Sequence, residues 1–487
     1  MASPAFAPLS RRTLLRGAGV AVAAATGVPS LVACGPTAPP TAPAPTGALG
    51  LTFPETFVFG AATSAYQIEG AASADGRGPS IWDTFSHTPG KVRNGDTGDV
   101  AADHYHRWAA DLDLVKSLGL GSYRFSLSWS RILPTGTGTV NQKGLDFYKR
   151  LIEGLHERGI APMATLFHWD LPQALQDRGG WENRDCAHWF ADYAQVLYRA
   201  LGDVVPTWLT LNEPKTVVQV GYQYGVHAPG RQDPRASLVV AHHLLLAHGL
   251  AVQAYRAAGG TGRIGPALNL APTYPADDSD AARRAALLAD GVENRLYLDP
   301  ILKGAYPADV VATWAADEPV RAAIRPDDRT VIASPVDLLA VQYYNPLFLT
   351  ASGSQARLRP TSVADWQQIY PDGLFDVLTR VKRDYGDIPL TITENGTPVD
   401  DVPDADGHVN DAPRVAFLRD HLAAAHRALQ SGVRLESYHV WSLLDNFEWA
   451  EGYAQRWGIT YVDFATQKRT PKASAEWYRT VATSRRL

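Results

Sequence analysis

Two glutamates each follow a short apolar run, and their side chains could act as a pair on one bond. Glu394 comes directly after Thr391–Thr393, and Glu213 comes directly after Trp208–Asn212. Hydrolysis of a glycosidic bond needs two carboxyl groups flanking that bond, one to donate a proton and one to stabilise or trap the oxocarbenium ion. Spacing alone leaves a second interpretation open, in which both groups are solvated loop carboxylates. The paired hypothesis therefore depends on what surrounds the two residues.

Polar and aromatic residues also stand at the ends of other strand-like runs. They are Gln67, Arg124, Trp129, His168, Trp169, Asp170, Tyr343, Tyr344 and Trp441. Barrel enzymes build their sites at the C-terminal ends of strands. A histidine, a carboxylate and several aromatic rings at such ends are expected to converge on one pocket.

Short β-rich runs alternate with stretches of helical periodicity, such as the one containing Leu112, Val115 and Leu118, over residues 51–487. The expected strands are 57–61, 122–127, 162–167, 207–211, 263–268, 338–343, 390–393 and 436–441. This pattern predicts an α/β fold, a single (β/α)8 TIM barrel, in which strands four and seven bring the two glutamates to opposing sides of the mouth. A doubly wound open sheet is the alternative. It would place a glycine-rich phosphate turn after the first strand, where no GxGxxG occurs.

Residues 1–34 are predicted to be an export signal. Ser10–Arg16 resembles the twin-arginine motif, and the apolar run 17–33 is short for a membrane span. The run ends in a lipobox-like sequence whose Cys34 would receive lipid; a cleaved secretory peptide with an incidental cysteine is the alternative. Residues 35–50 are rich in Pro, Ala and Thr and are expected to form an extended tether. We therefore expect an exported protein whose membrane contact is the lipid on Cys34.

Composition and missing motifs exclude several classes of protein. The net charge of −5 and the lack of a basic stripe give no reason to expect a nucleic-acid partner. Two cysteines cannot build a disulfide framework or a paired-cysteine metal site, and neither HExxH nor GxSxG occurs. We expect no metal and no cofactor. The 13 tryptophans and 20 tyrosines suit flat hydroxylated ligands, although large cores also use aromatic rings.

From about Phe53 to Tyr478 the sequence resembles glycoside hydrolase family 1, the β-glucosidase family. The motifs that carry this resemblance are FGAATSAYQIEG at 59–70, YRFSLSWSR at 123–131, TLNEP at 210–214, ITENG at 392–396 and DNFEWAEGY at 445–453. Five specific motifs in this order are very unlikely to arise by chance. The resemblance implies a TIM barrel with a retaining mechanism.

The resemblance also implies a role for each site residue. Glu213 is the expected acid/base and must start protonated, whereas Glu394 is the expected nucleophile and must stay ionised. Arg124 and Tyr344 are the expected partners that keep Glu394 ionised. The other expected substrate contacts are Asn212 on the sugar 2-OH, Trp441 under the sugar ring, and Gln67, His168, Glu448 and Trp449 on the remaining hydroxyls. Trp169, Gln342 and Trp457 are expected to support the site.

The chain departs from the family pattern at three places. Gln342 stands where the family usually has asparagine, so its amide lies one methylene further out. Trp457 replaces a usual phenylalanine on the O6 side of the sugar. Gln367 occupies the place of the usual leaving-group tryptophan, and Trp366 stands one residue earlier. These changes leave the geometry near the nucleophile and on the aglycone side open.

The expected function is that of a retaining exo-β-glycosidase, specifically a β-glucosidase that acts on small β-glycosides or cello-oligosaccharides. A transglycosidase of the same family and a catalytically silent surface sugar-binding protein are the alternatives. In the related 6-phospho-β-glycosidases a serine usually stands where this chain has Glu448. We expect Glu448 to be an anion that repels a 6-phosphate. The sequence leaves the oligomeric state open.

Overall fold

The barrel strands are present as the sequence predicts. The computed structural model describes residues 49–314 and 317–487. Eight parallel strands close into a barrel in the order β1-β11-β10-β7-β5-β4-β3-β2. Their bounds are β1 Val58–Ala62, β2 Ser122–Ser126, β3 Ala161–Phe167, β4 Thr207–Asn212, β5 Arg263–Asn269, β7 Leu339–Gln342, β10 Leu390–Asn395 and β11 Leu435–Trp441. The expected signal segment with Cys34, and all of the tether but its last two residues, lie outside the described residues.

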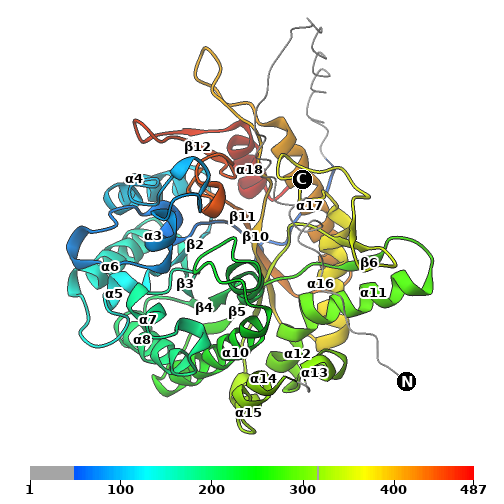
Figure 1. The fold of residues 1–487 in the computed structure, drawn as a ribbon. Coiled ribbons are helices and arrows are strands. Elements are labelled where there is room, and N and C mark those ends of the chain that lie inside the picture. Colours follow the sequence, from blue (N-terminus) through cyan, green and yellow to red (C-terminus); the bar gives the residue numbers. More distant parts are fainter. Residues whose placement is uncertain (1–48, 315–316) are drawn as a thin grey trace, which may run out of the picture.

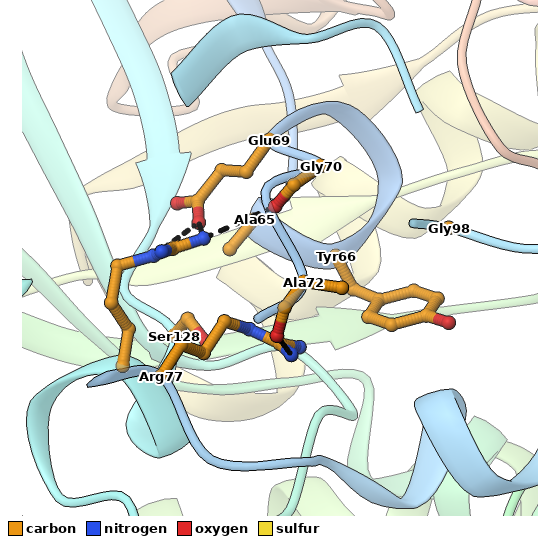
Figure 2. A pocket seen from close by; sticks show the side chains of 9 residues that line it. Ala65, Tyr66, Glu69, Gly70, Ala72, Arg77, Gly98 and Ser128 are labelled. Atoms are coloured by element: carbon orange, nitrogen blue, oxygen red, sulfur yellow. Dashed lines mark hydrogen bonds and ion pairs between the residues drawn. The ribbon is translucent and has the colours of Figure 1, made fainter. Parts of the chain in front are cut away.

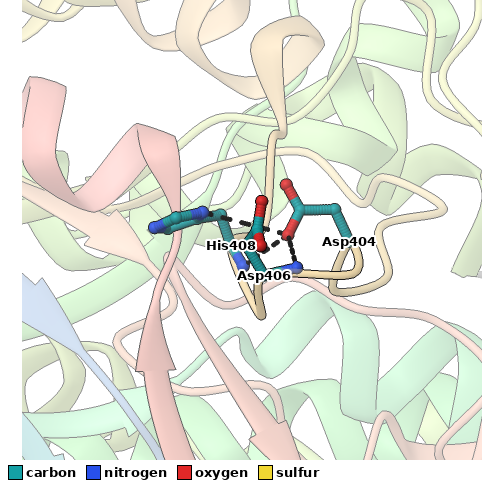
Figure 3. Close-up of side chains that lie close together, drawn as sticks. All are labelled: Asp404, Asp406 and His408. Atoms are coloured by element: carbon teal, nitrogen blue, oxygen red, sulfur yellow. Dashed lines mark hydrogen bonds and ion pairs between the residues drawn. The ribbon is translucent and has the colours of Figure 1, made fainter.

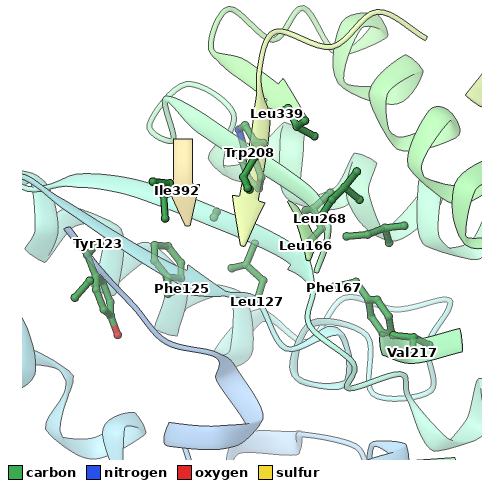
Figure 4. Close-up of a cluster of buried hydrophobic side chains, with 14 of the residues drawn as sticks. Tyr123, Phe125, Leu127, Leu166, Phe167, Trp208, Val217, Leu268, Leu339 and Ile392 are labelled. Carbon is green, nitrogen blue, oxygen red and sulfur yellow. The ribbon is translucent and has the colours of Figure 1, made fainter. Parts of the chain in front are cut away.

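The strands form because their apolar and β-branched residues are buried on both faces, which is typical of parallel sheets. Side chains alternate along each strand. In β2, Tyr123 and Phe125 join the main hydrophobic core, whereas Arg124 between them bonds to residues of other strands inside the barrel. Figure 4 shows part of this core, where Leu166, Trp208 and other buried side chains meet. Alternation thus packs the outside of the barrel and leaves polar groups facing inward.

Helices surround the barrel (Figure 1). The long ones are α4 His104–Ser117, α6 Gln142–Glu157, α8 Asp185–Leu201, α10 Pro234–Ala257, α11 Asp280–Asp290, α16 Pro371–Tyr385, α17 Ala412–Gln430 and α18 Ala473–Ser484. Shorter helices are α2 Ala65–Ile68, α3 Ile81–Ser86, α5 Trp129–Ile132, α7 Gln173–Gln176, α9 Pro214–Thr216, α12 Leu296–Lys303, α13 Ala308–Trp314, α14 Glu318–Ala323 and α15 Asp328–Ile332. Two small sheets lie outside the barrel, made of β6 Thr273–Pro275, β8 Leu347–Leu349 and β9 Gln355–Ala356, and of β12 Thr460–Asp463 and β13 Lys468–Pro471.

Helix α10 is the one helix in the described ranges that is long and apolar enough to cross a membrane. Most of its apolar stretch is buried against the barrel and neighbouring helices, as in the core helix of a globular domain. Its histidines are packing residues: His242 bonds to Asp328 and Tyr306, and His248 bonds to Thr210 on β4. The apolar character of α10 is therefore explained by its place in the fold.

Candidate active site

The two glutamates lie at the C-terminal ends of β4 and β10, three positions apart around the eight-stranded ring. The strand register shifts beside each of them, between Leu209 and Asn212 in one strand and between Ile392 and Glu394 in the other. Such irregularities re-aim side chains and are common next to active sites. Glu213 also has φ of 44°, a left-handed conformation that is uncommon outside glycine and often marks functional positions.

Glu394 is surrounded by donors. Its Oε1 accepts hydrogen bonds from Nη1 of Arg124 and from Nε2 of Gln342 at 2.7 Å, and its Oε2 accepts from the Tyr344 hydroxyl at 2.7 Å. Burial raises the pKa of Glu394, while Arg124 and Tyr344 oppose that effect. Three donors to one buried carboxylate favour its charged form. The arrangement suits a group that must act as an anion.

Glu213 has a different environment. Its Oε2 accepts a hydrogen bond from Thr216 at 2.7 Å, and no second hydrogen bond to its side chain is found within 49–314 and 317–487. Burial and the negative charge of Glu394 raise the pKa of Glu213 to about 7. Glu213 is therefore largely protonated below neutral pH and can donate that proton to a leaving group.

Gln342 bonds to Glu394 despite its departure from the family pattern. Its Nε2 lies 2.7 Å from Glu394 Oε1 and 2.6 Å from Asn212 Oδ1. Asn212 Oδ1 also accepts from Arg124 Nη2 at 2.5 Å. The longer side chain of Gln342 therefore connects Asn212 on β4 with Glu394 on β10. The sequence left the geometry near Glu394 open, and the structure shows a continuous hydrogen-bond network there.

The same network sets the tautomer of His168. Because Asn212 Oδ1 is an acceptor for two donors, Asn212 Nδ2 is the atom that donates to His168 Nε2, 3.0 Å away. Burial and the nearby Arg124 hold the pKa of His168 well below its usual value, so the ring is neutral and carries its proton on Nδ1. That Nδ1 is buried and has no hydrogen-bond partner in the described part of the chain. A sugar hydroxyl would satisfy it.

Gln67 joins the loop after β11 to the other side of the site. Its Nε2 lies 3.0 Å from Asn446 Oδ1, 3.0 Å from the Phe447 carbonyl and 3.3 Å from Glu448 Oε2. Burial and the charges of neighbouring carboxylates, Glu394 first among them, raise the pKa of Glu448 to about 8. This raised pKa favours the protonated carboxyl at neutral pH, which differs from the expected anion. Burial is the largest cause of the difference, and the charges of Glu394, Glu451 and Glu213 add to it.

Aromatic rings form the inner wall of the site. The His168 ring stacks at 5.8 Å from Trp441 and at 6.0 Å from Trp449, with interplanar angles of 16° and 18°. Trp169 packs against Trp449 with a centroid distance of 4.5 Å. Trp441 and Trp449 are almost fully buried. The structure thus brings the predicted aromatic residues together at one end of the barrel, next to the two glutamates.

A second group of aromatic rings extends outward from Tyr344, a residue that bonds to Glu394. Trp457 meets Tyr344 edge to face at 5.6 Å, and Trp366 stacks on Trp457 at 6.1 Å with an interplanar angle of 23°. Trp366 is 40% exposed, whereas Gln367 is buried and donates to the Gly396 carbonyl at 2.8 Å. At the position where the family pattern has a tryptophan, this chain therefore has Gln367, whose buried amide bonds to the backbone. Trp366 supplies the exposed ring instead.

The sequence did not indicate two further residues at the site. Thr216 bonds to Glu213, and the signal that could have revealed it is its position three residues later in a short helix, where side chains meet. The His227 ring lies 5.6 Å from Trp169 and 6.3 Å from Trp449. No pattern around His227 pointed to this place, because a loop brings it back from beyond α9.

Two other clusters have structural explanations. A small cavity of about 10 Å³, room for one water, lies beside Glu69 and Arg77. Figure 2 shows the residues that line it. There Glu69 accepts from Tyr148 at 2.6 Å and from Arg131 at 2.9 Å, so it is a buried ion-pair partner. A second, exposed group contains Asp404, Asp406 and His408 (Figure 3). It is a turn in which Asp404 Oδ1 accepts hydrogen bonds from the backbone N–H groups of Asp406 and His408.

Comparison with known proteins gives consistent matches along the barrel. The model of glycosyl hydrolase family 1 matches residues 50–487. β-Glucosidase A of Acetivibrio thermocellus is 47% identical over 440 residues, which cover 88% of this chain and 98% of that protein. The structure of a family 1 β-glucosidase from Thermotoga maritima aligns with a TM-score of 0.86 at 46% identity, covering 90% of this chain and 99% of that one. Its complex with glucoimidazole has the same score and identity and covers 90% and 100%. The similarity concerns the whole barrel and not an isolated motif.

Proposed function

The chain belongs to glycosyl hydrolase family 1, and we infer that it is a retaining β-glucosidase. The observation that carries this function is the asymmetry between the two glutamates. Glu394 accepts hydrogen bonds from three donors, whereas burial and the charge of Glu394 raise the pKa of Glu213 to about 7. Two carboxyl groups in such different hydrogen-bond environments can take the two different roles that a retaining glycosidase needs. No observation favours a transglycosidase or a silent sugar-binding protein.

We assign the first chemical step to attack by Glu394. Its carboxylate forms a bond to the anomeric carbon while the bond from that carbon to the leaving oxygen breaks. Glu213 gives its proton to the leaving oxygen, so the aglycone departs as an alcohol and a glycosyl ester remains on Glu394. Arg124 and Tyr344 hold the attacking carboxylate in place through the bonds described above.

In the second step water attacks the anomeric carbon, the bond from that carbon to the Glu394 oxygen breaks, and Glu213 takes the proton of the water. The charge of Glu394 is one cause of the raised pKa of Glu213. Formation of the ester removes that charge, so the pKa of Glu213 falls and its ionised form becomes the general base. Release of the sugar restores the charge on Glu394 and returns Glu213 to its acidic role. Two displacements at one carbon give net retention.

We propose that the other side chains of the site recognise the glucose unit. Asn212 faces the 2-OH, and Gln67, His168, Glu448 and Trp449 bond to the other hydroxyls, while Trp441 packs under the ring. The unpartnered Nδ1 of His168 and the protonated carboxyl of Glu448 supply donors for such bonds. The substrates would be small β-glycosides or cello-oligosaccharides, with Trp366 exposed on the aglycone side.

One experiment tests the function directly. Initial rates are measured on aryl β-glucosides, β-galactosides, β-fucosides and β-xylosides, and the anomer of the first-formed sugar is followed by NMR. We expect β-glucoside hydrolysis with the β-anomer formed first. Release of the α-anomer first would refute the retaining mechanism, and the absence of turnover on every β-glycoside would refute the enzyme itself.

We also propose that residues 1–34 direct twin-arginine export, that lipid on Cys34 anchors the protein, and that residues 35–50 hold the barrel of 51–487 off the membrane. The order of twin arginines, apolar run and cysteine supports this. In the native cell the protein should fractionate with membranes, and Cys34→Ala should release it. Lysine at both Arg11 and Arg12 should block export. A wild-type protein that remains soluble in the cytoplasm would contradict both proposals.

A further inference from the structure

A buried group of charged side chains lies next to the loop that carries Glu448. Its six members, called the ion network below, are Asp401, Asp411, Arg414, Asp445, Arg456 and Lys472. Five of the six side chains are fully buried, and Arg456 is 20% exposed. Three cations and three anions make the network neutral. The mechanism proposed above uses none of these groups.

Lys472 bridges two loops of this network. Its Nζ lies 2.8 Å from Asp401 Oδ2 and 2.8 Å from Asp445 Oδ1. Asp401 belongs to the segment that follows the nucleophile strand β10, and Asp445 belongs to the loop after β11. The backbone N–H of Lys472 donates to the Ile459 carbonyl at 2.9 Å, which fixes the residue itself at the start of α18.

Asp445 passes this anchoring on to the substrate loop. Its carboxylate also accepts from Arg456 Nη1 at 2.7 Å and from the Gly458 backbone N–H at 3.0 Å. A Cβ atom at Gly458 would lie 2.1 Å from the backbone nitrogen of Asp445, so the two chain segments are in direct contact. The residues after Asp445 are Asn446–Glu448, which meet Gln67. The position of Asp445 therefore fixes the start of the short segment that carries Glu448.

Arg414 anchors the other side of the network. It donates to the Thr397 carbonyl at 3.1 Å, to the Arg456 carbonyl at 2.7 Å and to Asp401 at 2.9 Å. Thr397 is three residues after Glu394. The loops after β10 and β11 are thus tied to one another from both sides, and the Lys472 ammonium group connects their two carboxylates.

We propose that Lys472 is a positioning residue for sugar recognition: its ammonium group, by bridging Asp401 and Asp445, holds Glu448 and Trp449 against the O4 and O6 side of the sugar. This inference rests on the role proposed above for Glu448. A lysine at the start of the C-terminal helix would thereby contribute to substrate selectivity without touching the substrate.

The proposal predicts a change in selectivity and not only in stability. A β-xyloside lacks the hydroxymethyl group that carries O6, so it depends less than a β-glucoside on the position of Glu448. The ratio of kcat/KM for an aryl β-glucoside to that for the matching β-xyloside is therefore the quantity to measure. Both values come from one preparation, so this ratio is independent of the fraction of enzyme that is folded.

Lys472→Met by itself is a poor test, because it can fail to fold. A double variant and a control are therefore used instead. Lys472→Met leaves two buried carboxylates facing one another, which strongly disfavours folding. In the double variant Lys472→Met with Asp401→Asn, one cation and one anion are removed, so the network stays neutral but the bridge is lost. Arg184→Met with Asp328→Asn is the matched control, because it also removes one cation and one anion from a mostly buried pair, and the partners of Arg184 are Ala323 and Asp328 and not residues of the site.

We expect the glucoside-to-xyloside ratio of the double variant to fall about tenfold, comparable to the loss of one well-placed contact. The control variant Arg184→Met with Asp328→Asn should keep the wild-type ratio. A double variant with the full wild-type ratio would overturn this proposal alone, even if both kcat/KM values fall together. A wild-type enzyme without preference for the glucoside would overturn the role of Glu448 and this proposal with it, whereas the absence of glycosidase activity would overturn the proposed function.

Discussion

Burial and the negative charge of Glu394 together raise the pKa of Glu213 to about 7, so the two glutamates titrate as a linked pair. The donors on Glu394 are Arg124, Gln342 and Tyr344, whereas Glu213 has a single side-chain donor within the described residues. One residue is thereby prepared as an anion and the other as an acid. This difference assigns their roles more firmly than the sequence spacing did.

Removing the charge of Glu394 should lower the pKa of Glu213. In Glu394→Gln the Coulombic contribution to that pKa is lost while the shape of the side chain is kept, so Glu213 should ionise at a lower pH than in the wild type. Carboxyl ¹³C NMR titration of both proteins measures this shift. Glu55→Gln, an exposed change at the start of the barrel, is the control and should leave the titration unchanged. An unchanged or higher pKa in Glu394→Gln would contradict the coupling.

Glu394→Ala should abolish turnover, because no carboxylate remains to attack the anomeric carbon. A small anion such as azide can enter the vacated space and attack from the same face, so it should restore activity on activated aryl glucosides. The expected product is the α-glucosyl azide, identified by NMR. Formation of the β-azide, or undiminished hydrolysis without azide, would mean that Glu394 is not the nucleophile.

Glu213→Ala should harm substrates in proportion to the basicity of their leaving group. Loss of a general acid typically costs about a hundredfold or more when the leaving group needs the proton. Activated aryl glucosides need little protonation, so they should still form the glycosyl-enzyme, which then accumulates because its hydrolysis lacks a base. Rates across a series of leaving-group pKa values and mass spectrometry of the intermediate measure this. Equal losses across the series would rule out the assignment.

Thr216→Val should move the alkaline limb of the kcat/KM profile to higher pH. The hydrogen bond from Thr216 stabilises the ionised form of Glu213 and therefore lowers its pKa. Without that bond Glu213 keeps its proton to a higher pH, and the enzyme stays active further into the alkaline range. Thr216→Ser keeps the hydroxyl and should retain the wild-type limb. A limb that moves to lower pH in Thr216→Val would show that the bond acts in the opposite sense.

Discrimination against 6-phospho-β-glucosides should increase as the pH rises through about 8, the value to which the pKa of Glu448 is raised. Below that pH the Glu448 carboxyl is protonated. Above it the Glu448 carboxylate faces the phosphate, and the two negative charges repel each other strongly. We expect the wild type to prefer unphosphorylated glucosides throughout, and Glu448→Ser to weaken them while easing the exclusion. The measurement is kcat/KM for a glucoside and its 6-phosphate between about pH 7 and pH 9, a range in which the phosphate already carries most of its second charge.

Glu448→Gln is the control for that pH dependence. Its amide stays neutral, so the ratio between the two substrates should no longer change around pH 8. Comparable wild-type kcat/KM values on the glucoside and its 6-phosphate would overturn the assignment of Glu448. A ratio that still rises with pH in Glu448→Gln would place the titrating group elsewhere.

The amino-acid sequence by itself determined the strands and the identity of the site residues. Each barrel strand is a short run of apolar and β-branched residues bounded by turns, so its hydrophobic pattern is local and can be recognised without coordinates. Glu213 and Glu394 follow two such runs directly. Parallel strands in a barrel must end at the same mouth, so Gln67, His168 and Trp441 could also be placed there before any contact was known.

Only the tertiary structure decided how those residues are charged and held. Burial, together with the charges of Glu394, Glu451 and Glu213, raises the pKa of Glu448 to about 8. Gln342 bonds to Asn212 because closure of the barrel brings the two side chains within reach of each other. Lys472 meets Asp401 and Asp445 across 71 and 27 residues of chain. Such contacts depend on distances and on solvent exclusion that exist only when remote segments have packed together, and no local pattern in the sequence encodes them.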